Sequence, residues 1–190
     1  MPSRPSILLH YAPALSHHAQ QAIAALCQEV RITAGKVFVT LEQWDTHEYI
    51  LMAGVVRSFL LSADGKDHTI AFFQGGTILS PHVSRTRAGR SLLNLEALTD
   101  VTVLQMDARQ FESLIEKNLE VRAFANAVLQ QELMQKVNRE IQLASWSAKA
   151  RLEQFRQDFE GLENLVPHPM IASYLGITNV SLSRLRKIMK

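Results

Sequence analysis

The spacing of hydrophobic positions changes along the chain and divides it into regions of different predicted structure. In residues 15–30, apolar side chains recur every three to four positions, which predicts an amphipathic helix. From residue 31 to about residue 106 the apolar runs are short and β-prone, and after Asp107 a helical period returns. The apolar positions of the first region are Ile23, Leu26, Cys27 and Val30.

The middle region contains many short candidate strands. Glycine and proline separate them, as expected for turns between strands. The dipeptide Asp64-Gly65 lies between two runs and predicts a tight hairpin turn in which both central residues have positive φ. Short strands at this spacing predict an antiparallel β-sandwich or roll. The runs are residues 37–39, 49–52, 55–56, 59–61, 69–73 and 101–104.

Two helices are predicted after Asp107. Phe111, Leu114 and Ile115 mark the first helix, and the second carries a long stripe of apolar residues at every fourth position. A long helix with such a stripe commonly packs against a partner helix. We therefore favour dimerisation, with packing against the chain's own β-region as the alternative. The stripe consists of Leu129, Leu133, Val137 and Ile141.

A small C-terminal module follows the helix breakers Gly161, Pro167 and Pro169. Two helical patterns flank Gly176, and glycine readily takes the left-handed conformation that a tight turn after a helix needs. Thr178 can cap the second helix through its hydroxyl group. These features predict a helix-turn-helix. Its shared core is expected to contain Ile171, Ala172, Leu175, Ile177, Leu182 and Leu185.

The outward face of the second helix carries the side chains expected of a recognition helix in a DNA major groove. Arginine pairs with guanine edges, and a small apolar group can meet a thymine methyl. We expect Arg184 to read a base, and Arg186, Lys187 and Lys190 to hold phosphates. The predicted DNA-binding residues are Thr178, Asn179, Val180, Ser181, Ser183, Arg184, Arg186 and Lys187.

Composition and charge narrow the function classes. Hydrophobic residues make up 47% and charged residues 20% of the chain, as in a folded globular protein. The net charge is only +2, but no acidic residue follows Glu163, so the positive charge is concentrated at the C-terminal end. Such a local basic end favours contact with phosphate.

The sequence also suggests a cellular compartment. No apolar run approaches the roughly 20 residues that a membrane-spanning helix needs. Residues 1–11 lack the features of a secretory signal. We therefore expect a cytoplasmic protein without a membrane partner. The single cysteine, Cys27, allows no intramolecular disulfide.

In the order of its motifs, the chain resembles the catabolite activator (Crp/Fnr) family of bacterial regulators along nearly its whole length. The module 171–189 is the most specific part of the resemblance. The other matching segments are Ala34-Gly35-Lys36, Tyr49-Ile50-Leu51, Gly54-Val55-Val56-Arg57, Asp64-Gly65-Lys66, Phe73-Gln74-Gly75 and Glu96-Ala97-Leu98.

The resemblance implies an α+β fold in three parts. Residues 1–118 would form a sensor domain, an N-terminal antiparallel β-roll of the cyclic-nucleotide-binding type. Residues 119–143 would form a long central dimerisation helix, and residues 144–190 a C-terminal winged helix-turn-helix domain. The implied function is that of a homodimeric transcription regulator that reads a two-fold symmetric operator in double-stranded DNA, with RNA polymerase as a further partner. A wing segment after the second helix would lie beyond Lys190.

Two motifs depart from the family pattern. Members that bind cyclic AMP carry a Gly-Glu pair whose carboxylate accepts from the ribose, and here Leu79-Ser80 stands at that position. Arg90-Ser91 stands about where the phosphate-binding pair belongs, so Ser80, Arg90 and Ser91 are candidates for a different effector pocket. We expect no cyclic nucleotide and no cofactor. The family's Arg-Glu start of the recognition helix is Asn179-Val180 here, which predicts a different operator.

An enzyme, a haem sensor and a module without DNA binding are the alternatives. Metal-dependent enzymes on related rolls use a His-x-His motif, but no two of the seven histidines have that spacing. We therefore expect neither catalysis nor a metal site. A haem sensor needs only one or two axial ligands, so it stays open. A ligand-binding or protein-interaction module of the same fold would have no reason to keep an acid-free basic face, which favours DNA binding.

Overall fold

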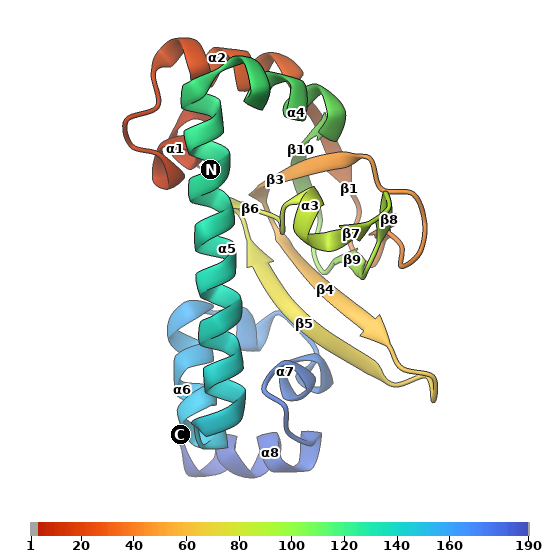
Figure 1. The fold of residues 1–190 in the computed structure, drawn as a ribbon. Helices are drawn as coiled ribbons and strands as arrows, with labels where there is room; N and C mark the ends of the chain where they lie inside the picture. Colours follow the sequence, from red (N-terminus) through yellow and green to blue (C-terminus); the bar gives the residue numbers. More distant parts are fainter. Residues whose placement is uncertain (1–3, 190) are drawn as a thin grey trace.

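The computed structural model describes residues 4–189. It consists of N-terminal helices, a β-roll, the long helix α5 (Leu119–Ser145) and a C-terminal group of short helices (Figure 1). Figure 1 shows α5 running along one side of the molecule, from the N-terminal helices to the C-terminal group. Within residues 4–189, no helix is both long and apolar enough to cross a membrane.

The roll is built from two four-stranded sheets and a two-stranded hairpin, and all strand pairs are antiparallel. The strand order is β1-β10-β3-β6 in one sheet and β2-β9-β4-β5 in the other. The predicted α+β fold with an antiparallel roll is therefore confirmed. The strands are β1 (Gln28–Ile32), β2 (Val37–Val39), β3 (His47–Ala53), β4 (Val55–Leu61), β5 (Asp67–Gln74), β6 (Thr77–Ile78), β7 (Thr86–Arg87), β8 (Arg90–Ser91), β9 (Asn94–Ala97) and β10 (Val101–Asp107).

Strand β3 is buried on both faces, which explains its unbroken apolar run at residues 49–52. Successive side chains of a strand point to opposite faces. Tyr49 and Leu51 pack in the roll interior against the second sheet. Ile50 and Met52 pack on the other face, against the helices. The helices on that face are α1 (Arg4–Tyr11), α2 (His17–Leu26), α4 (Ala108–Lys117) and α5.

The helix predicted over residues 15–30 is wrong at its C-terminal end. Helix α2 ends at Leu26, Cys27 is extended with φ −85° and ψ 132°, and β1 follows directly. Val30 pairs with Val103 of β10 instead of completing a helical face. The helical spacing of residues 26–30 is therefore overridden by strand pairing with a segment far along the chain.

The hairpin at Asp64-Gly65 is present, but its turn differs from the prediction. Strands β4 and β5 pair up to Leu61 opposite Asp67, and Ser62 N–H donates to the Lys66 carbonyl at 2.9 Å. Only Gly65 has positive φ, at 78°. Its N–H donates to the Ser62 carbonyl at 2.8 Å. This is a three-residue loop that ends on a left-handed glycine, not a two-residue primed turn.

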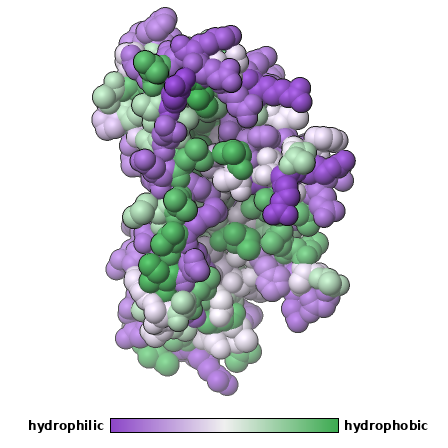
Figure 2. Space-filling view, in the orientation of Figure 1, coloured by the Kyte–Doolittle hydropathy of each residue, from purple (hydrophilic) through white to green (hydrophobic). Residues whose placement is uncertain are grey.

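Only the first half of helix α5 packs against other parts of its own chain. Its first half buries Val121, Phe124 and Val128 against the roll and the N-terminal helices. The second half leaves apolar side chains in the open, with Leu133 64% and Ile141 50% exposed. Figure 2 shows this apolar surface as a line of hydrophobic residues running down the helix. The exposed apolar residues of α5 after Val128 are Leu129, Leu133, Met134, Val137, Ile141 and Leu143.

The C-terminal helices have a core of their own that also includes two roll residues. Phe72 of β5 and Val55 of β4 belong to the same buried cluster as Leu152, Phe155 and Leu162. The C-terminal elements are α6 (Ala148–Asp158), the short 3₁₀ helix η1 (Leu162–Asn164), α7 (His168–Tyr174) and α8 (Asn179–Ile188). Helix α3 (His82–Arg85) lies in the roll between β6 and β7.

Candidate nucleic-acid interface

Helices α7 and α8 form the helix-turn-helix that the sequence predicts. Gly176 has φ 66°, and the Ile177 N–H after it donates back to the Ala172 carbonyl at 3.0 Å, which closes the end of α7. Thr178 caps α8, because its hydroxyl oxygen accepts the Ser181 N–H at 3.1 Å. A side chain on Gly176 would also crowd Leu143 of α5, at 3.0 Å from the added Cβ. The turn therefore favours glycine mainly for its positive φ.

One face of α8 is fixed in the core of the module. Leu182 is completely buried, and Leu185 packs partly buried on the same cluster. Ile171, Ala172 and Leu175 of α7 meet them there, with Leu152 and Phe155 of α6 below. Because these apolar contacts set the rotation of α8 about its axis, the opposite face must point outward.

The outward face of α8 carries most of the predicted DNA-binding residues. Arg184 and Lys187 are exposed and form no ion pair with any described residue. Val180 is 61% exposed, so its side chain is accessible to a partner. Ser181 is half-buried beside the cap. The exposed members of the predicted set are Thr178, Asn179, Val180, Ser183, Arg184 and Lys187.

Arg186 lies differently from the expectation that it holds phosphate. Its Nε donates to Glu163 Oε1 at 2.6 Å, and Arg156 Nε donates to Glu163 Oε2 at 2.7 Å. The guanidinium of Arg186 is therefore used to join α8 to the segment after α6. Lys190, the other expected phosphate contact, lies outside the described residues.

The pair of arginines around Glu163 makes part of the module's stability depend on pH. Hydrogen bonds from Arg156 first, and from Arg186, hold the pKa of Glu163 below its ordinary value. A lowered carboxyl pKa in the folded state stabilises the fold above the ordinary value, about 4.3, and this contribution is lost as pH falls through the lowered pKa. We expect the unfolding midpoint of the wild type to fall below about pH 4 more steeply than that of Glu163→Gln. Parallel melting curves from pH 7 to pH 3 for the two proteins measure this, and equal slopes would contradict it.

The module is attached to the roll and to α5 by aromatic and polar contacts. Phe72 of β5 lies among Phe155, Phe159 and Tyr174, with ring centroids 5.3 to 6.0 Å apart. The Arg139 guanidinium of α5 lies 3.9 Å from the Tyr174 ring centroid. Backbone contacts reinforce the attachment, since the Thr69 N–H donates to Ser173 Oγ at 3.0 Å. The orientation of α8 is thus tied to strand β5 of the roll through α6 and α7.

The residues proposed for an effector pocket have separate partners. Arg90 lies over Trp44, 4.8 Å from the ring centroid, and donates to the Glu42 carbonyl. Ser91 is buried, and its hydroxyl donates to the Leu93 carbonyl at 2.7 Å. Ser80 is buried, and its carbonyl accepts from Arg85. None of these contacts brings the Arg90 and Ser91 side chains together as an anion site.

Sequence reasoning missed a buried cation in the roll. The Arg85 side chain at the end of α3 is fully buried, and its Nε donates to Asp45 Oδ2 at 2.8 Å. The other guanidinium nitrogens donate to the carbonyls of Ser80 and His47. Burial and the nearby Asp45 carboxylate raise the pKa of Tyr49 to about 12. No motif marks this arginine as buried, because its partners are scattered along the chain.

Among the side chains that the structure describes, no group of three or more His, Cys, Asp and Glu residues could hold a metal ion. The clearest candidate site is the exposed basic face of α8, with Arg184 and Lys187 accessible on it.

Comparison with known proteins agrees with this architecture. Residues 29–118 match the family model of the cyclic nucleotide-binding domain. The chain is similar to the nitrogen fixation regulation protein FixK of Bradyrhizobium diazoefficiens, with 28% identity over 170 residues, 84% of this chain and 70% of that protein. Its fold is similar to that of FixK2 from Bradyrhizobium japonicum, with a TM-score of 0.74 and 21% identity over 86% and 84% of the two chains. The Thermus thermophilus catabolite activator protein matches with a TM-score of 0.60 and 21% identity, over 97% and 86%.

The β-roll is thus a domain of the cyclic-nucleotide-binding class, followed by a long helix and a helix-turn-helix. In sequence and in fold the chain is similar to regulators of the Crp/Fnr family, as the order of its motifs indicated.

Proposed function

We propose that this protein is a sequence-specific DNA-binding regulator of transcription that acts as a homodimer. The observation that carries the proposal is the face of α8. It is exposed, basic and free of acidic residues, while the opposite face is locked in the core by Leu182. A rigidly held helix with a free arginine and short polar side chains suits the major groove. The DNA-contacting set excludes Arg186, which is paired with Glu163.

The proposed division of the chain follows the same logic. Residues 1–118 form the sensor, 119–143 the dimerisation helix and 144–190 the DNA-binding part. The similar proteins support the regulatory role, since FixK is a nitrogen fixation regulation protein. The operator would be two-fold symmetric, and RNA polymerase is a further partner where the regulator activates. The residue standing at the cyclic AMP glutamate position is Ser80, so the effector would differ from cyclic AMP.

Selection from a pool of random duplexes tests DNA binding directly. The purified chain is expected to enrich one short motif that is repeated with two-fold symmetry. Retention of all duplexes with one affinity would instead favour a ligand-binding or protein-interaction module that does not read DNA.

Dimerisation is expected to depend on the exposed stripe of α5. Val137 is 42% exposed in the single chain, so Val137→Glu leaves the fold intact but places a carboxylate inside the proposed helix pair. An unpaired buried charge costs several kcal/mol, so the dimer dissociation constant should rise at least about 100-fold. Analytical ultracentrifugation measures this constant. Val137→Leu keeps the surface apolar, so it is the matched control and should stay dimeric. Equal dissociation constants for the two variants would show that the stripe is not part of the dimer interface.

A further inference from the structure

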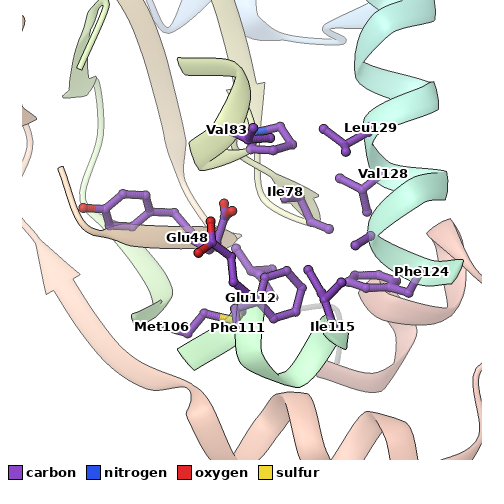
Figure 3. Close-up of a pocket in the computed structure, with 14 residues that line it drawn as sticks. Glu48, Ile78, Val83, Met106, Phe111, Glu112, Ile115, Phe124, Val128 and Leu129 are labelled. Atoms are coloured by element: carbon purple, nitrogen blue, oxygen red, sulfur yellow. The ribbon is translucent and has the colours of Figure 1, made fainter. Parts of the chain in front are cut away.

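A cavity of about 220 Å³, partly open to solvent, lies between the roll and the helices that cover it. Figure 3 shows the side chains that surround it, with Ile78 and Val83 on the roll side, Phe111 and Ile115 on α4, and Phe124, Val128 and Leu129 on α5. It is separate from the residues Arg90 and Ser91, which do not line it.

The walls of the cavity are mainly apolar. Side chains come from β3, β6, β10, α3, α4 and α5, so the space lies where six elements meet. An apolar cavity of about 150 Å³ in another protein stays dry and binds benzene. The space here is therefore of a size to accept a molecule with one or two rings.

Two carboxyl groups give the cavity its polarity. Glu48 comes from β3, where its Oε2 accepts the His82 N–H at 2.9 Å and lies 3.8 Å from Arg85. Burial raises the pKa of Glu48. Glu112 comes from the exposed side of α4. No Lys, Arg, His or Cys is among the lining residues, so the cavity offers acceptors and negative charge but no cation for an anion.

We propose that this cavity is an effector site for a small, largely apolar molecule with one or two rings, a hydrogen-bond-donating group and no negative charge. The apolar part would contact Phe111, Phe124 and Val128. The donor would face the carboxyl groups of Glu48 and Glu112. This ligand class differs from cyclic nucleotides, whose phosphate needs a cation or N–H donors.

The position of the cavity would allow a bound ligand to alter DNA affinity, and this part of the inference rests on the proposed function. Leu129 lines the cavity and also begins the exposed stripe of α5 proposed as the dimer interface. A ligand in the cavity would therefore contact the roll and the dimerisation helix together. Ligand binding that favours one packing of this helix shifts the dimer between states of different DNA affinity.

Binding to the cavity can be measured without DNA, using three probes with one ring system. Indole is neutral, tryptamine adds a cationic amine and indole-3-acetate adds a carboxylate. We expect saturable thermal stabilisation and calorimetric binding by indole and tryptamine, with dissociation constants below about 1 mM. Indole-3-acetate should bind at least about tenfold more weakly, and Glu112→Gln should reduce the preference for tryptamine over it.

Two alanines of α5 supply a matched pair of variants for the same assay. Ala125 lines the cavity, whereas Ala123 is exposed on the same helix and does not. Ala125→Leu fills the space and should abolish binding of indole and tryptamine, while Ala123→Leu should leave it unchanged. The proposal is overturned if neither probe stabilises the folded wild type, or if both variants bind equally well.

A third result would also overturn the proposal that the cavity binds a small molecule. If Ala125→Leu weakens dimerisation and the wild-type dimer binds no probe, the cavity is filled by the partner's helix. If the probes bind as expected but do not alter affinity for the selected duplex, the cavity is a ligand site and its coupling to DNA is wrong. Failure of the duplex selection itself would leave the probe measurements interpretable, so the two proposals fail separately.

Discussion

Arg184→Ala is expected to remove base discrimination at one position of each half-site, at a cost of about 1–3 kcal/mol per position. Arg184 is exposed on α8 and has no acidic partner among residues 4–189, so its planar guanidinium is available to donate two hydrogen bonds to a guanine edge. Alanine cannot replace these bonds, and the position should accept any base pair. Repeating the duplex selection with the variant measures the change, as flattening of one position within an otherwise retained motif.

Lys187→Ala is the control for this prediction. A lysine that holds phosphate contributes equally to all sequences, so its removal should weaken every duplex alike. The slope of log affinity against log salt should fall by about 1 for each phosphate that the variant no longer neutralises. The two roles would be wrongly assigned if Arg184→Ala and Lys187→Ala lowered affinity equally and left the selected motif unchanged.

Asp45→Ala should destabilise the roll by up to about 3–5 kcal/mol, because it removes the hydrogen-bonded counter-ion of the buried Arg85 and leaves the more distant Glu48 carboxylate, at 3.8 Å. The Arg85 side chain has no exposed surface and that of Asp45 has 2%, so water cannot replace the missing carboxylate without opening the fold. Chemical denaturation of the variant, followed by circular dichroism, gives this change in the free energy of unfolding.

The double variant Asp45→Ala/Arg85→Met distinguishes the effect of the poorly paired Arg85 charge on stability from the effect of the altered packing. Methionine keeps much of the volume of arginine and carries no charge. The double variant should therefore recover a large part of the stability that Asp45→Ala removes, because removing both partners is far less costly than removing one. If the double variant is no more stable than Asp45→Ala, then the buried charge is not the cause of the destabilisation.

The spacing of hydrophobic residues correctly predicted the elements that are buried along one face or over a continuous apolar run. The strand at residues 101–104 and the core of the helix-turn-helix are such cases, since Val103 and Leu182 are completely buried where the pattern placed them. The end of α2 was predicted wrongly because the pairing of Val30 with Val103 is a contact between distant segments. Local spacing carries no information about such a pairing.

Ion pairs were the hardest part of the site to predict. Arg184 and Arg186 are both basic residues of α8, yet one faces outward and the other donates to Glu163, 23 positions earlier. Arg85 finds Asp45 40 positions away and becomes a core residue. Composition indicates a basic end, but only the packed structure shows which cations remain free for DNA.

The cavity could not be predicted for a related reason. Its walls come from segments spread between Glu48 and Leu129, and most of the lining residues taken alone look like ordinary core positions. A void is a property of how helices α4 and α5 sit on the roll, so it has no sequence signature.

The spacing of half-sites tests the central claim most directly. A dimer places two α8 helices in successive major grooves, about 34 Å apart, so the two half-sites must lie on one side of the duplex. The measurement is the affinity for a selected symmetric duplex and for the same duplex with about 5 base pairs, half a helical turn, inserted at its centre. We predict at least about a 100-fold loss of affinity for the lengthened duplex. Equal affinity for the two duplexes would contradict a dimer that reads DNA through α8.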